Sequence, residues 1–225
     1  MSSRTEEKWI ATLTHGRYLI ERGETSEGAP LLVGFHGYGE NAERHLEKLR
    51  QIPGAERWLL CAIGALHPFY NTKTGEVVDS WMTKRGREQA IDDNVAYVAR
   101  VISEVRRTHQ TSDRLVIAGF SQGVAMAYRA ALLTGVRCDG LIVLAGDVPA
   151  DAVVGQPRVP PVLLGRGTRD QWYTETKMDE DLAVLKQLGA TVETCVFEGG
   201  HDWTPEFWRQ AGELLARTGA PRSIA

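Results

Sequence analysis

Short hydrophobic runs alternate with amphipathic stretches along most of this chain. The runs are apolar at successive positions rather than at every second one. A strand that is buried on both faces shows this pattern, because neither face needs polar side chains. We therefore expect strands at residues 30–35, 58–63, 114–119, 140–146, 161–165 and 191–197.

The stretches between these runs carry helical spacing. Ile91, Val95, Val98, Ile102 and Val105 follow one another at intervals of three or four residues, which places them on one helix face. Similar reasoning predicts helices at residues 41–52, 91–105, 124–133, 175–188 and 205–217. Alternating strands and helices favour an α/β fold with a mostly parallel central sheet and helices on both faces.

Residues 67–87 do not fit this alternation. The segment is rich in glycine, threonine and charged residues, and we expect an irregular connection. A connection of this length is unusual in a compact domain and is often functional. The sequence predicts that it contributes to the rim of a substrate site, and leaves open whether it forms a lid. No large cap domain is expected.

Composition limits the class of protein. The chain has 225 residues, with 43% hydrophobic and 24% charged side chains and a net charge of -3. This apolar content excludes intrinsic disorder, and the length favours a single domain over residues 1–225. A nucleic-acid-binding protein would carry a basic excess, so no nucleic-acid partner is expected.

The sequence also bears on location. No hydrophobic run approaches the roughly 18 residues that a membrane helix needs, so stable membrane insertion is not expected. Residues 1–8 are charged and lead into no apolar segment, unlike a secretion signal. The three cysteines are too few and too scattered for a disulfide framework or a zinc site. We expect a cytoplasmic protein without metal or cofactor.

A nucleophile candidate follows the run at 114–119. Residues 119–123 read Gly-Phe-Ser-Gln-Gly, which matches the G-x-S-x-G pattern, and an alanine-rich helical stretch comes next. A strand, a sharp turn and a helix are the setting in which this pattern exposes a reactive serine. Ser121 is therefore the predicted nucleophile; the alternative is a serine that only caps the helix.

A serine hydroxyl needs a base, and His201 is the candidate. In this type of site the order along the chain is serine, acid, histidine. Of the six histidines only His201 follows Ser121. The order therefore selects one residue.

The acid is less determined. Asp170 and Asp147 each follow a predicted strand, and polar residues at such ends lie where ligands bind in parallel sheets. We favour Asp170, which lies just ahead of the strand–helix unit that carries His201, and keep Asp147 as the alternative. Asp202 adjoins the histidine but violates the order.

A second glycine-bearing turn, residues 36–41, follows the first apolar run. Such a turn directs a backbone amide at the carbonyl oxygen of the substrate. The predicted oxyanion donors are the amides of Tyr38 and Gln122. His36 precedes Ser121, so we interpret it as a structural residue that holds the turn.

These residues together resemble the phospholipase/carboxylesterase family of small α/β-hydrolases, which includes acyl-protein thioesterases and bacterial carboxylesterases. The similarity covers about residues 15–217 and rests on the segments at 36–39, 119–123, 161–170 and 200–206. It implies an α/β-hydrolase fold with Ser121 as nucleophile, Asp170 as orienting acid and His201 as base. It also implies the Tyr38 and Gln122 amides as oxyanion donors.

Three positions depart from the family pattern. Val124 stands where a second glycine is frequent, Tyr38 where leucine is common, and Glu40 where aspartate is common. They leave the predicted triad intact and alter the expected shape of the acyl pocket.

The predicted function is hydrolysis of carboxylic esters with short to medium acyl chains through an acyl-enzyme. Trp81, Trp172 and Trp203 lie near the predicted site and are expected to line an acyl groove, with core packing as the alternative. An acyl thioesterase or lysophospholipase on the same triad, an acyltransferase or peptidase, and a non-catalytic binding protein remain open. The expected partner is a small-molecule ester or thioester, and a homodimer is compatible with the sequence.

Overall fold

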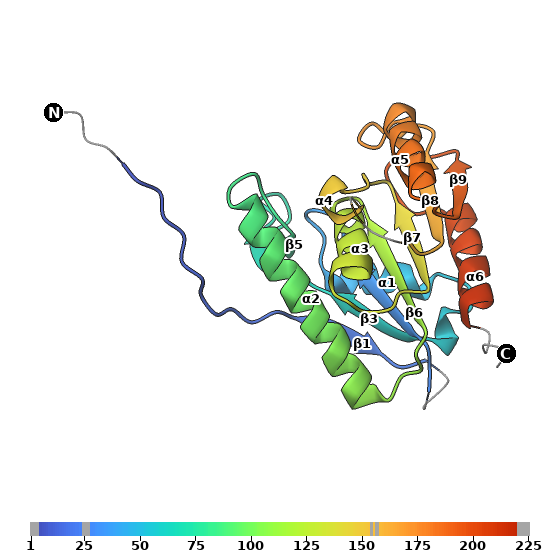
Figure 1. Cartoon of the computed structure of the whole chain (residues 1–225), viewed down its shortest axis with the longest axis horizontal. Coiled ribbons are helices and arrows are strands. Elements are labelled where there is room, and N and C mark those ends of the chain that lie inside the picture. The colour runs from blue at the N-terminus through green and yellow to red at the C-terminus, as the bar shows by residue number, and fades with distance from the viewer. Residues whose placement is uncertain (1–4, 24–27, 154, 156–157, 220–225) are drawn as a thin grey trace.

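The structure is a computed structural model and describes residues 5–23, 28–153, 155 and 158–219. Figure 1 shows a central twisted sheet with helices packed along it and an extended N-terminal segment. The elements are β1 (Tyr18–Glu21), β2 (Leu31–Phe35), α1 (Ala42–Arg50), η1 (Ala55–Arg57), β3 (Leu59–Ile63), β4 (His67–Tyr70), β5 (Val77–Ser80), α2 (Arg87–His109), β6 (Leu115–Phe120), α3 (Gln122–Leu133), β7 (Gly140–Leu144), α4 (Ala150–Val153), β8 (Val162–Gly167), α5 (Glu175–Gln187), β9 (Val192–Phe197) and α6 (Pro205–Gly219).

Within the described residues the central sheet has seven strands in the order β1-β3-β2-β6-β7-β8-β9. Strand β1 runs antiparallel to β3, whereas every other neighbouring pair is parallel. The expected mostly parallel sheet is confirmed, and all six predicted strands are present. Strand β1 was not predicted from the sequence, because all four of its residues are only partly buried and their pattern is weak.

Helices cover both faces of the sheet (Figure 1). A Cβ added at Gly34 in β2 would collide with His45 and Leu49 of α1, so this residue faces α1. Gly34 pairs with Ala118 in β6, and the next residue, Gly119, closely approaches Ala127 of α3. Since successive strand residues point to opposite faces, α1 and α3 lie on opposite sides of the sheet.

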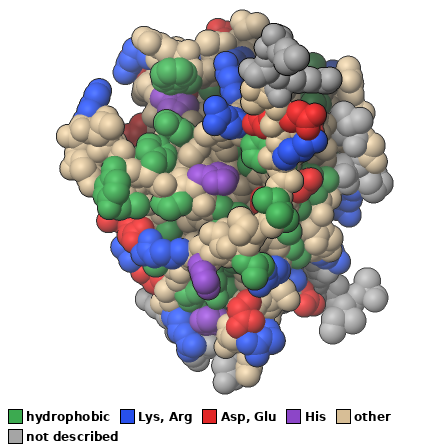
Figure 2. Space-filling model, turned by 90° about the vertical axis from the view of Figure 1, so that its left-hand side faces the viewer, with side chains coloured by type: hydrophobic (Ala, Val, Ile, Leu, Met, Phe, Trp, Pro, Cys, Tyr) green, Lys and Arg blue, Asp and Glu red, His purple; other side chains and the backbone are tan. Residues whose placement is uncertain are grey.

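The central strands lie within the hydrophobic core. Every residue of β2, β3, β6, β7 and β8 is buried, as expected for parallel strands covered on both faces. The surface on the left of Figure 1 is not uniformly apolar like this interior. There Figure 2 shows hydrophobic side chains in separate groups among charged ones.

Residues 67–87 are not wholly irregular, contrary to the expectation from the sequence. The segment contains a two-stranded antiparallel hairpin, β4 and β5, with Tyr70 paired to Val77 and His67 paired to Ser80. Its strands are short and partly exposed, and Pro68 lies inside the first of them. Proline in a strand lowers the strand signal in a sequence, which explains why an irregular loop was expected.

The hairpin is attached to the body beside α1. Asn41 caps α1 by accepting a hydrogen bond from Arg44 N at 3.0 Å. Its side-chain amide also donates to Val77 O at 3.1 Å. One side chain therefore stabilises both the start of α1 and the position of β5.

We expect Asn41→Ala to lower the free energy of unfolding by about 2 kcal/mol, because a helix cap and a part-buried hydrogen bond are lost together. Thr174→Ala is the matched control, since Thr174 caps α5 through a longer bond of 3.5 Å at an exposed site. It should cost less than about 1 kcal/mol. Chemical denaturation of the variants measures both values, and equal losses would contradict the double role of Asn41.

Candidate active site

Ser121 occupies a strained turn between β6 and α3. Its backbone has φ 52° and ψ -119°, and it is one of three described non-glycine residues with positive φ. Its amide donates to Leu144 O in β7 at 2.9 Å. Such backbone strain persists only where the surroundings enforce it, and it often marks a functional position.

Close backbone contacts enforce this turn. A Cβ added at Gly123 would lie 2.1 Å from Phe35 O, and one at Gly146 would lie 2.3 Å from Ser121 O. One at Gly119 would lie 2.6 Å from Gly123 O. The absence of side chains at these three glycines therefore allows β2, β6 and β7 to meet around Ser121.

The Ser121 side chain makes no capping hydrogen bond with α3. The alternative interpretation, that this serine only caps the helix, thus receives no support. The first amides of α3 lie next to the serine, and the amides that open a helix have no partner within it. They also carry the partial positive charge of the helix dipole.

Asp170 and His201 meet at the carboxyl ends of β8 and β9. His201 Nδ1 lies 2.8 Å from Asp170 Oδ2. The other carboxylate oxygen of Asp170 accepts hydrogen bonds from Trp172 N at 2.8 Å and Tyr173 N at 3.0 Å. Because a carboxylate only accepts, the Nδ1 proton points to Asp170, and in the neutral ring the lone pair is therefore on Nε2.

The loops that carry these two residues are joined by their backbones. Arg169 N donates to Gly199 O at 2.7 Å, and Thr168 N donates to Phe197 O at 2.9 Å. A Cβ at Gly167 would lie 2.2 Å from Gly200 O, so the two loops are in close contact. The aspartate and the histidine are therefore held together by their main chains as well as by their side chains.

His201 also lies near the serine turn. Its ring is centred 5.0 Å from the ring of Phe120, the residue that precedes Ser121. Within the described residues no hydrogen bond joins Ser121 to His201. Bonds of this kind are often long in unliganded enzymes and shorten when substrate binds.

The other two aspartates have different partners. Asp147 lies 3.1 Å from the ammonium of Lys177. Asp202 pairs with Lys48 at 3.1 Å and accepts a hydrogen bond from Trp203 N. Neither of these contacts involves His201.

The turn at residues 36–40 lies against Ser121. A Cβ added at Gly37 would be 3.3 Å from the Cβ of Ser121. Gly37 N donates to Glu40 Oε2 at 2.8 Å, and burial raises the pKa of the Glu40 carboxyl. Gly39 N donates to Asp79 O at 3.1 Å, which connects the turn to β5.

His36 holds this turn from inside. Its Nε2 accepts a hydrogen bond from Ala65 N at 3.1 Å, so Nδ1 carries the proton that is donated to Gly37 O at 2.7 Å. Burial lowers the pKa of His36 to about 4. The ring is therefore neutral at pH 7, and Asp79 at 3.8 Å does not form an ion pair with it. These contacts fit the structural role that the sequence predicts.

The three tryptophans do not share one environment. Trp81 is fully buried and donates from Nε1 to His36 O at 2.9 Å, and Trp203 is only 4% exposed. Both therefore belong to the core that supports the site, as the alternative of core packing predicts. Trp172 is 75% exposed and is the one of the three whose ring is open to a ligand.

Sequence reasoning missed the side chain of Gln122, which had been considered only for its backbone amide. Its Oε1 accepts a hydrogen bond from Trp81 N at 2.9 Å, and its Nε2 donates to Met82 O at 3.0 Å. The start of α3 is thereby bound to the segment that follows β5. Only the motif position of Gln122 could have suggested this, since the partner is 40 residues away along the chain.

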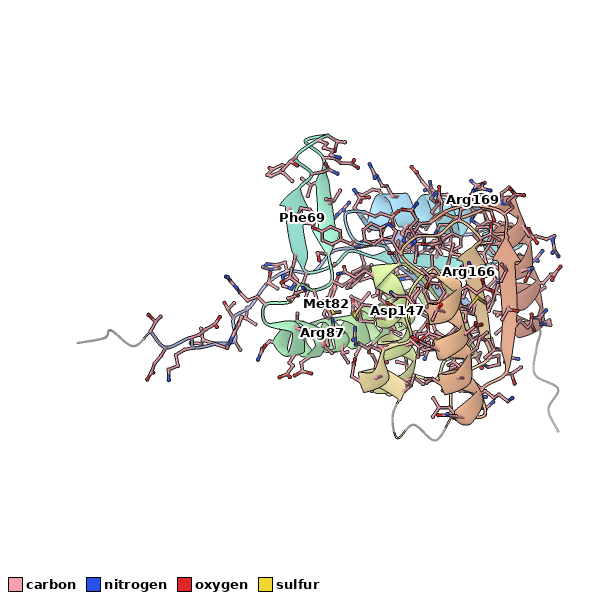
Figure 3. All side chains as sticks on the ribbon, turned by 90° about the horizontal axis from the view of Figure 1, so that it is seen from above. Phe69, Met82, Arg87, Asp147, Arg166 and Arg169 are labelled. Carbon is pink, nitrogen blue, oxygen red and sulfur yellow. The ribbon has the colours of Figure 1, made fainter. Side chains whose placement is uncertain are left out.

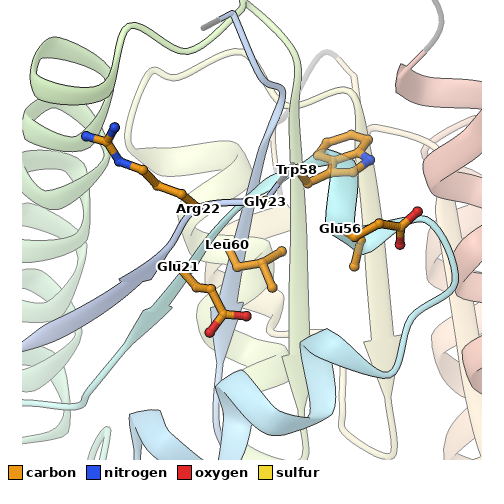
Figure 4. A pocket seen from close by; sticks show the side chains of 7 residues that line it. Glu21, Arg22, Gly23, Glu56, Trp58 and Leu60 are labelled. Atoms are coloured by element: carbon orange, nitrogen blue, oxygen red, sulfur yellow. The ribbon is translucent and has the colours of Figure 1, made fainter. Parts of the chain in front are cut away.

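One further feature lies apart from this constellation. A hollow of about 360 Å³, lined by residues that include Glu21, Glu56 and Trp58, lies at the amino ends of the parallel strands (Figure 4). It is at the opposite edge of the sheet from Ser121.

In the ranges that the structure describes, no three metal-binding side chains converge. No helix there is long and apolar enough to cross a bilayer.

Solved structures of known proteins share this fold. The fold matches the crystal structure of a Bacillus cereus carboxylesterase, with a TM-score of 0.71, 17% identity and coverage of 90% of this chain and 94% of that one. It also matches Zea mays acyl-protein thioesterase 2, with a TM-score of 0.72, 19% identity and coverage of 92% and 100%. The protein thus has an α/β-hydrolase fold.

The family follows from sequence. The model of the phospholipase/carboxylesterase family matches residues 18–218, and the chain belongs to this family of esterase and thioesterase-type hydrolases. Acyl-protein thioesterase 1 of Yarrowia lipolytica (strain CLIB 122 / E 150) is 32% identical over 119 residues, which are 50% of this chain. The match spans 52% of that relative, about half of its length.

The buried histidines predict how stability depends on pH. Burial lowers the pKa of His36 to about 4 and that of His45 to about 3, against about 6.5 in the unfolded chain. The unfolded state therefore takes up protons first, and stability falls as the pH drops from 7 toward 4. The loss should be about 3 kcal/mol for each histidine.

Replacing one of them separates the contributions. His45→Leu should remove about half of the pH dependence that the two buried histidines contribute, measured by denaturation at pH 7, 5.5 and 4, with His67→Leu at an exposed position as the control. A wild-type pH dependence in His45→Leu would contradict the assignment.

Proposed function

We propose that the protein is a serine hydrolase that cleaves carboxylic esters with short to medium acyl chains through an acyl-enzyme intermediate. The observation that carries the proposal is the 2.8 Å contact between His201 and Asp170 beside the strained turn of Ser121. Membership of the phospholipase/carboxylesterase family supports it.

In this proposal His201 acts on Ser121. The lone pair on Nε2 takes the hydroxyl proton while Oγ attacks the acyl carbonyl, and the resulting imidazolium is stabilised by the carboxylate of Asp170. His201 then gives the proton to the leaving alcohol. A water molecule, deprotonated by the same nitrogen, releases the acid and restores the serine. The base must be neutral, so turnover declines in acid.

The amides of Tyr38 and Gln122 are the proposed oxyanion donors. Both belong to turns that meet at Ser121: Gly37 lies against its Cβ, and Gln122 is the first residue of α3. A preorganised donor of this kind lowers the barrier by roughly 2.7–4 kcal/mol. The donors are backbone groups, so we expect the departure at Tyr38 from the common leucine to leave the chemistry intact.

A thioester substrate is the second candidate. It is favoured by the sequence similarity to an acyl-protein thioesterase of Yarrowia lipolytica. The proposed triad would perform the same steps on a thioester, with a thiol as the leaving group in place of an alcohol. A lysophospholipid ester would be cleaved by the same steps, and the three classes differ only in what the rim of the site accepts.

Exposed aromatic rings border the proposed site. Trp172 is joined to Asp170 through its backbone amide, and its ring is exposed. The ring of Tyr38 is stacked on Phe69 of the hairpin, with centroids 5.4 Å apart, and is 62% exposed. In Figure 3, viewed from above, Phe69 lies on the hairpin at the left, and Arg166 and Arg169 lie on the right-hand side. We propose that acyl chains bind between these sides.

Ser121→Ala should reduce hydrolysis of a chromogenic butyrate ester by at least about 10³-fold, because the covalent step loses its nucleophile. Ser103→Ala, an exposed serine on α2, is the matched control and should keep the wild-type rate. Steady-state assays on ester, thioester and peptide substrates make the comparison. Full activity in Ser121→Ala, or a peptide rate that exceeds the ester rate, would refute the proposal.

Trp172→Ala should raise KM for octanoyl esters about tenfold and leave acetate esters within twofold, because a longer chain loses more apolar contact. Trp9→Ala, which removes an exposed tryptophan from the N-terminal segment, should change neither. A chain-length series measures KM for each variant. An equal effect on acetate and octanoate would show that Trp172 does not contact the acyl chain.

A further inference from the structure

The orientation of Asp170 depends on the residues that follow it. Its Oδ2 faces His201, and its Oδ1 accepts the amides of Trp172 and Tyr173. Both amides belong to the turn between β8 and α5. The carboxylate therefore points at His201 only while this turn keeps its shape.

Tyr173 is the buried residue of that turn. Its side chain is 1% exposed, and its hydroxyl donates to Asp181 Oδ2 on α5 at 2.8 Å. Its neighbour Trp172 is exposed and gives the turn little anchoring. The hydrogen bond from the Tyr173 hydroxyl to Asp181 therefore ties the buried side of the turn to α5.

Asp181 connects three segments. The oxygen that receives the Tyr173 hydroxyl also accepts Val148 N at 3.1 Å, from the loop after β7. Asp181 is 8% exposed although it carries a carboxylate, and a buried carboxylate of this kind is costly unless its hydrogen bonds are satisfied. Its place in the fold is therefore explained by the groups that it joins.

The charges around Asp181 are few. Burial raises the pKa of its carboxyl, with Asp147 acting in the same direction, whereas the bonds from Tyr173 and Val148 and the charge of Lys177 oppose the rise. Tyr128 on α3 is a further titratable neighbour. In the described residues the hydroxyl of Tyr128 has no hydrogen-bond partner.

We propose that Tyr173 and Asp181 are positioning residues of the reaction: their hydrogen bond fixes the turn that aims Asp170 at His201. This inference rests on the proposed hydrolase function. Neither residue touches the substrate. Without the bond, the amides that hold Asp170 Oδ1 are free to move, and the carboxylate no longer stabilises the imidazolium in one geometry.

Tyr173→Phe tests the inference, because it removes the hydroxyl and keeps the ring. We expect kcat for a short-chain ester to fall about tenfold with KM within twofold. The acid limb of the kcat/KM profile should move to lower pH, since a less stabilised imidazolium forms only in stronger acid. Asp181→Asn retains an oxygen acceptor and should keep kcat within about threefold of wild type.

Tyr128→Phe is the matched control, since it removes a buried hydroxyl that has no partner. It should change neither kcat nor the acid limb. Thermal denaturation of each variant shows whether it is folded at the assay temperature. A purely structural role for Tyr173 would lower stability and active fraction without moving the acid limb, and this result would overturn the inference.

A second readout does not require turnover. NMR detects the proton between His201 Nδ1 and Asp170, together with the pH midpoint of the His201 ring signals. In Tyr173→Phe the Nδ1 proton signal should broaden or shift, and the midpoint should move down by at least about half a pH unit, a change of about threefold in proton affinity. Unchanged signals would refute the positioning role, whereas the absence of ester hydrolysis in the wild type would refute only the proposed function.

Discussion

The fold can place a serine at the end of β6 only because three backbones approach there without side chains between them. Gly123 lies against the carbonyls that end β2, and Gly146 lies against the carbonyl of Ser121. The resulting turn holds Ser121 at φ 52°, a conformation that costs energy for a residue with a side chain. The packed sheet around it supplies that energy, since β2, β6 and β7 are buried throughout.

The remaining parts of the candidate site reach the same edge by different physical means. The loops of Asp170 and His201 are bound to each other by backbone hydrogen bonds across the ends of β8 and β9. The turn at 36–40 is bound to the hairpin through Asp79 and is supported from inside by the neutral ring of His36. Trp81 and Gln122 then join the hairpin segment to both turns. The geometry of the site is thus distributed over contacts that are far apart along the chain.

This distribution explains how much could be read from the sequence. The buried strands, the helices between them and the turn at Ser121 have local signals, and chain order selects His201 as the candidate base. The local sequence pattern does not separate Asp170 from Asp147, because both residues follow strands. The contact between Asp147 and Lys177, which sets Asp147 apart, is visible only in the three-dimensional structure. The hairpin was missed because its strands are short and half exposed. The burial of Trp81 and the bond between Tyr173 and Asp181 are tertiary contacts, which spacing does not encode.

In the proposed mechanism, one hydroxyl, one imidazole and two main-chain amides converge on a single carbonyl group of the substrate. A crystal structure of the protein after reaction with a small alkyl fluorophosphonate tests it most directly, because the tetrahedral phosphorus mimics the intermediate. We expect phosphorus bonded to Ser121 Oγ, with the phosphoryl oxygen about 3 Å from the amide nitrogens of Tyr38 and Gln122 and His201 Nε2 facing the adduct. A phosphorus atom on another residue, or a phosphoryl oxygen turned to solvent away from both amides, would contradict it.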